Sequence, residues 1–175
     1  SDVYKRQVYN ACIHHGELGM IRKTHIYDMD GTIVCSMHRY RSMVANGKIT
    51  IDFPYWLQNQ HKAMKDKLLP LASQYKKDLT DSSVFVIIAT ARVLKEPDQD
   101  FIMQKLGNPD AIVSRKEGDS TSGAALKING LKSIFNIASL WDTEKRFWED
   151  NLHYLTSVCS ALDIRGHYVK SQQGW

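Results

Sequence analysis

Two aspartates stand two residues apart at the end of an apolar run, in the stretch HIYDMDGT at 25–32. A strand that ends in Asp28 and Asp30 presents both carboxylates at its C-terminal edge, which is where open α/β sheets bind their ligands. Gly31 then allows the backbone to turn sharply. An EF-hand loop needs Gly at position six and an acid at position twelve. Counted from Asp28, the Gly is fourth and the twelfth residue is Arg39, so a calcium loop is excluded, and a chance turn with two acids is the remaining alternative.

The rest of the chain alternates short apolar runs with helix-like segments, which predicts an α/β fold. We expect a Rossmann-like three-layer sandwich with a mainly parallel sheet. The expected strands are 24–28, 84–89, 111–113, 146–148 and 167–169, and a helix is expected over 98–106.

A long gap separates the first two expected strands. About 55 residues lie between Asp28 and Val84, more than one crossover helix needs. We therefore expect a small cap inserted after the first strand, at about 33–80. Asn46-Gly47 is a favourable hairpin turn within it, and its later part has a helical pattern that is interrupted near Pro70.

Composition limits the class of protein. The 175 residues are 43% hydrophobic and 24% charged, which is typical of one globular domain and excludes a disordered chain, a collagen-like repeat and a disulfide scaffold. Residues 2–7 resemble translated sequencing-adapter sequence, so we expect 1–19 to be a non-native or disordered leader and 20–175 to form the domain. No apolar run approaches the roughly 20 residues of a membrane span. Three scattered cysteines favour a cytoplasmic location.

The Asp-x-Asp-Gly-Thr stretch resembles the first motif of the haloacid dehalogenase-like (HAD) superfamily. The resemblance implies that Asp28 is a nucleophile that attacks phosphorus to form an aspartyl-phosphate. It implies that Asp30 protonates the leaving oxygen and then accepts a proton from the hydrolytic water. Gly31 and Thr32 are expected to contribute to substrate binding.

Thr90 and Arg92 directly follow the most apolar run. Thr90 resembles the second HAD motif, a Thr or Ser whose hydroxyl binds the phosphoryl oxygens, and Arg92 adds a clamp for phosphate. The alternative is a helix N-cap threonine beside a surface arginine. In the expected cap, Arg39 is a further candidate for substrate binding, and Tyr55 and Trp56 are able either to hold a base or simply to pack.

The third motif of the superfamily is a lysine. The stretch at 115–127 resembles the sequence that precedes this lysine in the phosphatase domain of phage-type polynucleotide kinase-phosphatases. The resemblance assigns Lys127 to neutralise Asp28 and the phosphoryl group. Lys132 is the alternative, although a helix lysine is by default solvated.

The fourth motif is acidic and binds the metal. Glu149 and Asp150 resemble the acidic turn of the same relatives, so we expect them to hold the metal together with Asp28 and Asp30. A helix N-cap is the alternative explanation of Asp150. Asp142 is the rival ligand, although it follows Lys127 too closely to leave room for both a helix and a strand.

The electrostatics of such a site require cations. A carboxylate about 4 Å from one phosphate charge is opposed by about 4 kcal/mol at an effective dielectric near 20, so Mg²⁺ and a lysine are needed. We expect a Mg²⁺-dependent phosphomonoesterase that acts on a nucleotide or on a terminal phosphate of a polynucleotide. The alternatives are a small-metabolite phosphatase for sugar or cofactor phosphates, a phosphomutase, and a catalytically silent phosphate-binding module. Asn151 stands where the polynucleotide phosphatases have Arg, which weakens the nucleic acid reading. No GxxxxGK[ST] loop occurs, so no kinase domain is expected on this chain.

Overall fold

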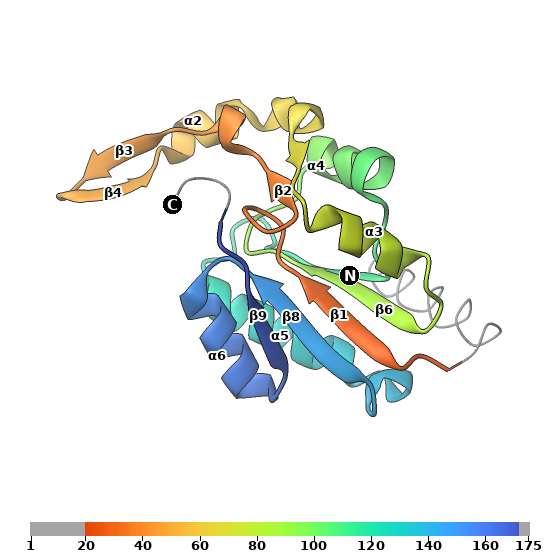
Figure 1. Cartoon of the computed structure of the whole chain (residues 1–175). Helices are drawn as coiled ribbons and strands as arrows, with labels where there is room; N and C mark the ends of the chain where they lie inside the picture. The colour runs from red at the N-terminus through yellow and green to blue at the C-terminus, as the bar shows by residue number, and fades with distance from the viewer. Residues whose placement is uncertain (1–19, 172–175) are drawn as a thin grey trace.

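A five-stranded parallel sheet forms the centre of the computed structural model, which describes residues 20–171 (Figure 1). The spatial order of its strands is β7-β6-β1-β8-β9, and all four pairings are parallel. The strands are β1 (Lys23–Tyr27), β6 (Val84–Ala89), β7 (Ala111–Val113), β8 (Glu144–Glu149) and β9 (Arg165–Tyr168). The expected α/β class and parallel sheet are confirmed. The expected strands 84–89 and 111–113 have those bounds, whereas β8 is longer than the 146–148 we expected.

Helices cover both faces of the sheet (Figure 1). The helices are α3 (Ala72–Leu79), α4 (Glu96–Phe101), a π-helix η3 (Ile102–Leu106), α5 (Gly123–Phe135), a 3-10 turn η4 (Ala138–Leu140) and α6 (Leu152–Leu162). The expected helix 98–106 is therefore α4 continued by a π-helical turn. The three-layer, Rossmann-like arrangement agrees with the sequence expectation.

Strand β6 shows why the sheet must be covered on both sides. Its alternate residues Phe85 and Ile87 pack with α5 and α6 in one buried cluster, and Val86 and Ile88 pack with α3 and α4 in another. All six residues of the strand are buried. A continuous apolar run of this kind is typical of a parallel strand between two helical layers.

The insertion after β1 forms a cap on a short two-stranded stem. The stem pairs β2 (Val34–Cys35) with β5 (Lys67–Leu68) in antiparallel orientation. Between these strands lie η1 (Met37–Arg39), β3 (Ser42–Ala45), β4 (Lys48–Ile51), α2 (Phe53–Gln58) and η2 (Gln60–Lys65). Helix α3, at the end of the insertion expected at 33–80, packs on β6 and so lies in the sheet layers.

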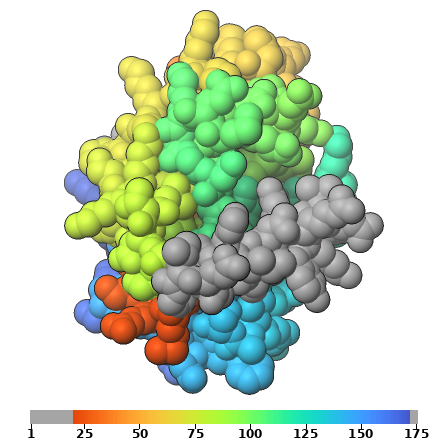
Figure 2. Space-filling view, turned by 90° about the vertical axis from the view of Figure 1, so that its right-hand side faces the viewer, coloured from red at the N-terminus to blue at the C-terminus, as the bar shows by residue number. Residues whose placement is uncertain are grey.

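The hairpin β3–β4 projects from the body of the molecule as an arm (Figure 1). Its turn residues Asn46 and Gly47 have φ values of 51° and 73°, which are those of the turn expected from the Asn-Gly pair. On the other side of the cap, η2 lies against α4, and the space-filling view shows these segments in contact (Figure 2).

Among the described residues, no helix combines the length and the apolar character that a membrane crossing requires. The leader expected at 1–19 lies outside the described residues.

Truncation to alanine should lower the stability of the protein much more at a buried isoleucine than at an exposed one. Ile87 is 0% exposed, whereas Ile49 on the hairpin is 74% exposed. We expect Ile87→Ala to lower the free energy of unfolding by about 2–5 kcal/mol, because it leaves a cavity in a packed core. The control Ile49→Ala should change it by no more than about 0.5 kcal/mol. Urea unfolding followed by circular dichroism measures both, and equal losses would contradict the position of β6.

Candidate functional site

A cavity of about 620 Å³ lies between the C-terminal edge of the sheet and the cap. The predicted site residues that line it are Asp28, Asp30, Thr90, Arg92, Glu149 and Asp150. They come from the ends of β1, β6 and β8, which are neighbours in the sheet. The cap supplies the opposite wall, which includes Tyr40, Ile49 and Trp56. The structure thus brings residues far apart in the sequence to one ligand-sized space.

Asp28 follows directly after β1 and is buried at the centre of the site. Its backbone N–H donates to the carbonyl of Trp148 on β8 (2.9 Å), which continues the pairing of the two strands. Its Oδ1 accepts a hydrogen bond from Lys127 Nζ (2.7 Å), and its Oδ2 accepts one from Thr32 Oγ1 (3.0 Å). Thr32 is therefore placed against the carboxylate of Asp28, and it is not among the residues that line the cavity.

Lys127 reaches the site from α5 and is 0% exposed. Its ammonium also donates to Glu149 Oε2 (2.5 Å), so one cation lies between two buried carboxylates. The rings of Phe147 and Tyr154 lie 5.7 Å and 5.1 Å from the same nitrogen. The rival Lys132 lies exposed on α5. The structure therefore brings Lys127, and not Lys132, to the acidic groups.

The ionisation of this group follows from burial and from the mutual contacts of its members. Burial raises the pKa of Asp28 above its ordinary value, although the charge of Lys127 opposes the shift. Burial, and after it the charge of Asp28, also raise the pKa of Glu149. Burial alone would lower the pKa of Lys127, but the two carboxylates outweigh it and the pKa is raised. The lysine therefore stays charged, and the carboxylates are short of positive charge.

Asp28, Glu149 and Asp150 form an acidic cluster that fits a metal ion. Each offers an oxygen atom, and these atoms lie within 4.8 Å of one another. A Cβ added to Gly31 would lie 2.2 Å from Asp150 Oδ2. The carboxylate of Asp150 therefore occupies the space that this glycine, with its φ of +82°, leaves open. Oxygen donors with an excess of negative charge are the ligands that Mg²⁺ prefers.

The other two acids proposed as ligands differ in position. Asp142 lies before β8, at the edge of the sheet opposite the cavity, and is not among the residues that line it. The side chain of Asp30 lines the cavity but is not a member of the acidic cluster. Its Oδ1 accepts hydrogen bonds from Ser36 Oγ (2.7 Å) and from Arg92 Nη1 (3.0 Å).

Thr90 and Arg92 lie in the turn after β6. The N–H of Thr90 donates to the carbonyl of Val113 (2.8 Å), and the N–H of Arg92 donates to Thr90 Oγ1 (3.4 Å). Arg115 reinforces this turn, because its Nε donates to the carbonyl of Ala91 (2.7 Å).

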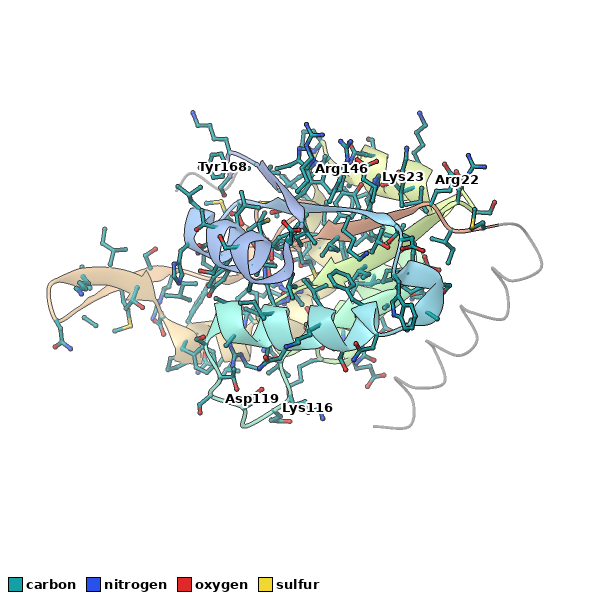
Figure 3. All side chains as sticks on the ribbon, turned by 90° about the horizontal axis from the view of Figure 1, so that it is seen from below. Arg22, Lys23, Lys116, Asp119, Arg146 and Tyr168 are labelled. Atoms are coloured by element: carbon teal, nitrogen blue, oxygen red, sulfur yellow. The ribbon has the colours of Figure 1, made fainter. Side chains whose placement is uncertain are left out.

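The loop that begins at Arg115 stays outside the cavity. Lys116 and Asp119, labelled in Figure 3, lie on the side of the molecule away from Tyr168, which lines the cavity. The part of the stretch 115–127 that precedes α5 therefore supports the site from outside the cavity.

Arg39, like Gly31 and Thr32, is a predicted substrate-binding residue that is not among the residues that line the cavity. Its side chain is 0% exposed. Nε and Nη2 donate to the two oxygens of Asp66 (2.9 and 2.7 Å), and Nη2 also donates to Asp98 Oδ1 (2.9 Å). Asp66, Asp98 and Ser36 were not predicted from the sequence. Asp98 carried only the signal of an acid in the first turn of a helix, which any surface helix offers.

The sequence matches one family of known proteins. A family model described as bacteriophage T5 5′-deoxynucleotidase matches residues 9–120, which is more than half of the chain. The match includes Asp28, Asp30 and Thr90 and ends before Lys127. No curated protein matches the sequence significantly.

Two solved structures are similar. One is of the Pnkp1/Rnl/Hen1 RNA repair complex, with 21% identity and a TM-score of 0.57 over 85% of this chain and 42% of that chain. The other is the N-terminal part of the protein BF1531 from Bacteroides fragilis, described as containing a phosphatase domain complexed with Mg. It has 13% identity and a TM-score of 0.45 over 93% of this chain and 40% of that chain. The chain spans about two fifths of the length of each, and the first likeness concerns the fold alone.

Removal of the central cation should destabilise the protein strongly. We expect Lys127→Met to lower the free energy of unfolding at neutral pH by about 3–5 kcal/mol, because Asp28 and Glu149 would lose the charge that balances them in a buried site. Lys132→Met removes the same ammonium from an exposed position of the same helix and should cost no more than about 0.5 kcal/mol. Urea unfolding of both variants provides the comparison, and equal stability would refute the buried ion pairs.

Proposed function

We propose a function for this chain from the premise that it belongs to the bacteriophage T5 5′-deoxynucleotidase family. The function is that of a Mg²⁺-dependent phosphomonoesterase of the HAD type, which hydrolyses deoxynucleoside 5′-monophosphates through an aspartyl-phosphate on Asp28. The observation that carries the proposal is the placement of Asp28. It is a buried carboxylate at the end of β1, held by a buried lysine, with Asp30 facing the same cavity.

Asp28 is the nucleophile of the proposed reaction. One of its carboxylate oxygens attacks phosphorus, a P–O bond to Asp28 forms, and the bond from phosphorus to the nucleoside oxygen breaks. Lys127 and Thr32 hold the two carboxylate oxygens and so orient the group. Water then attacks the aspartyl-phosphate, which releases inorganic phosphate and restores the carboxylate.

Asp30 moves the proton in both steps. Its Oδ1 is held by Ser36 and Arg92, so we assign the proton to Oδ2. That oxygen donates the proton to the leaving nucleoside oxygen in the first step and takes one from the attacking water in the second. The hydroxyl of Thr90, at the end of β6, lies on the cavity wall and is proposed to bind a phosphoryl oxygen.

The acidic cluster is proposed to bind Mg²⁺ through Asp28 and Asp150. Glu149 is the least exposed of the three acids (1%), and its oxygens accept hydrogen bonds from Lys127 and from the N–H of Asn151, so we assign it a supporting role. When bound, Mg²⁺ supplies positive charge that offsets the phosphate dianion and the carboxylates.

The cap wall fits a nucleoside. Tyr40, Ile49, Ile51 and Trp56 form an aromatic and apolar surface that faces the acids across the cavity. The cavity volume of about 620 Å³ lies within the range of small-molecule sites, and an aromatic wall suits the flat face of a base. Arg39, buried beneath this wall, is proposed to act through its neighbours and not by contact with substrate.

A substrate panel tests the proposal directly. With Mg²⁺ present, we expect the wild-type protein to hydrolyse deoxynucleoside 5′-monophosphates in preference to 3′-phosphorylated oligonucleotides and sugar phosphates. Asp28→Asn should lower the rate by about a thousandfold or more, because the nucleophile is lost, while circular dichroism shows an intact fold. A preference for sugar phosphates would favour a small-metabolite phosphatase. Binding of nucleotides without turnover would favour a silent module.

Loss of one proposed ligand should weaken the affinity for Mg²⁺ in a measurable way. We expect Asp150→Asn to raise the Mg²⁺ concentration at half-maximal activity by at least about tenfold, since even indirect changes around a metal cost that much. The matched control is Asp142→Asn, at the opposite edge of the sheet, which should leave this concentration unchanged. The metal assignment fails if the two variants behave alike or if the control carries the effect.

A further inference from the structure

We propose that a buried chain of ion pairs connects the cap to Asp30 and positions this carboxyl group for proton transfer. The chain, called here the cap bridge, consists of Asp66, Arg39, Asp98 and Arg92. The inference rests on the proposed function, because it assigns the bridge a part in the proton-transfer step. Arg39, Asp66 and Asp98 are positioning residues, since none of them lines the cavity.

The bridge begins inside the cap, where Arg39 of η1 binds Asp66, which follows η2. Both side chains are fully buried. The contact is bidentate, with Nε and Nη2 of Arg39 on the two oxygens of Asp66, the geometry in which arginine and carboxylate fix each other's orientation most strongly. His38 Nε2 lies 2.8 Å from Asp66 Oδ1. The guanidinium also lies 4.5 Å from the ring centre of Trp56.

Asp98 carries the bridge from the cap to the sheet layers. Its Oδ1 accepts hydrogen bonds from Arg39 Nη2 and from Arg92 Nη2, each at 2.9 Å. Its Oδ2 accepts one from the N–H of Lys95 at the start of α4 (3.0 Å). The carboxylate is therefore fixed to the helix at one oxygen and shared by two arginines at the other.

Arg92 connects Asp98 to Asp30 at the site. Its Nη2 is held by Asp98, and its Nη1 donates to Asp30 Oδ1 (3.0 Å). Ser36 Oγ, in the stem region of the cap, donates to the same oxygen (2.7 Å). Among the described residues, no hydrogen bond to Asp30 Oδ2 is found. The bridge thus fixes one oxygen of the acid and directs the other to the cavity.

The charges of the bridge favour a positioning role over a purely stabilising one. Two arginines face three carboxylates when Asp30 is included, all in a largely buried region. Buried ion pairs of this kind contribute little net stability compared with apolar packing. They do fix geometry, because each guanidinium is planar and its donors have fixed directions. The orientation of Asp30 is the part of this geometry that faces the substrate.

The test compares how much each variant slows the hydrolysis of two substrates that differ in their leaving group. A nucleoside oxygen needs a proton to leave, whereas p-nitrophenolate leaves without one. The comparison uses kcat/KM, which reports the steps up to departure of the leaving group and not the later attack of water, a step common to both substrates. We expect Asp98→Asn to lower kcat/KM for deoxynucleoside 5′-monophosphates by about tenfold or more, a part of what general acid catalysis contributes. It should lower kcat/KM for p-nitrophenyl phosphate by less than about twofold. In the Asp30→Asn background, Asp98→Asn should have no further effect on the nucleotide reaction.

The control is Asp52→Asn, which removes a cap carboxylate that pairs with Arg41 and has no contact with the bridge. It should not alter the ratio of the two rates. If Asp98→Asn does not fold, Arg39→Lys permits the same comparison, because it keeps the charge and loses the bidentate contact. An equal loss on both substrates, or an equal change of the ratio in Asp52→Asn, overturns the bridge. A wild-type protein that hydrolyses neither substrate overturns the proposed function itself.

Discussion

The contact of Lys127 with Asp28 and Glu149 is the interaction on which the site depends. It joins α5 to the ends of β1 and β8 through one ammonium group. A buried carboxylate without a partner is costly, and the lysine opposes the rise in pKa that burial causes at both acids. The core makes the contact possible, because Leu126 and Leu131 of the same helix pack into the cluster that contains Ile26 and Phe147. Packing of α5 therefore determines whether Lys127 reaches the strand ends.

One lysine does not balance the acids around it. Asp28, Glu149 and Asp150 lie close together, and a phosphate ligand would add further negative charge. The described side chains therefore leave the cluster short of positive charge, and the proposed divalent cation would make up the difference. Gly31 is needed for a steric reason, since any side chain there would displace the carboxylate of Asp150.

The sequence predicted the sheet, and the gathering of the acids and Thr90 at its edge, for the same physical reason. Apolar runs define buried strands, and polar residues just after them gather at one edge, as Asp28 and Thr90 do. The choice between Asp142 and Asp150 depended on which residues form β8, because Asp142 precedes the strand and Asp150 follows it. The burial of Arg39 was not predictable, because its partners Asp66 and Asp98 are distant in the chain and resemble surface acids.

The cap has two parts that differ in how they are held. Its base is fixed to the sheet layers by buried charges, through Arg39 and Asp98. Its outer hairpin β3–β4 pairs only within itself among the described strands, and Val44 and Ile49 are 71% and 74% exposed. An isolated two-stranded hairpin is marginally stable. The carboxylate of Asp30, which we propose to transfer the proton, is held by Ser36 and Arg92 at the fixed base, whereas Ile49 on the cavity wall belongs to the outer hairpin. Under the proposed function, substrates that differ in their base would thus meet an unchanged phosphate site.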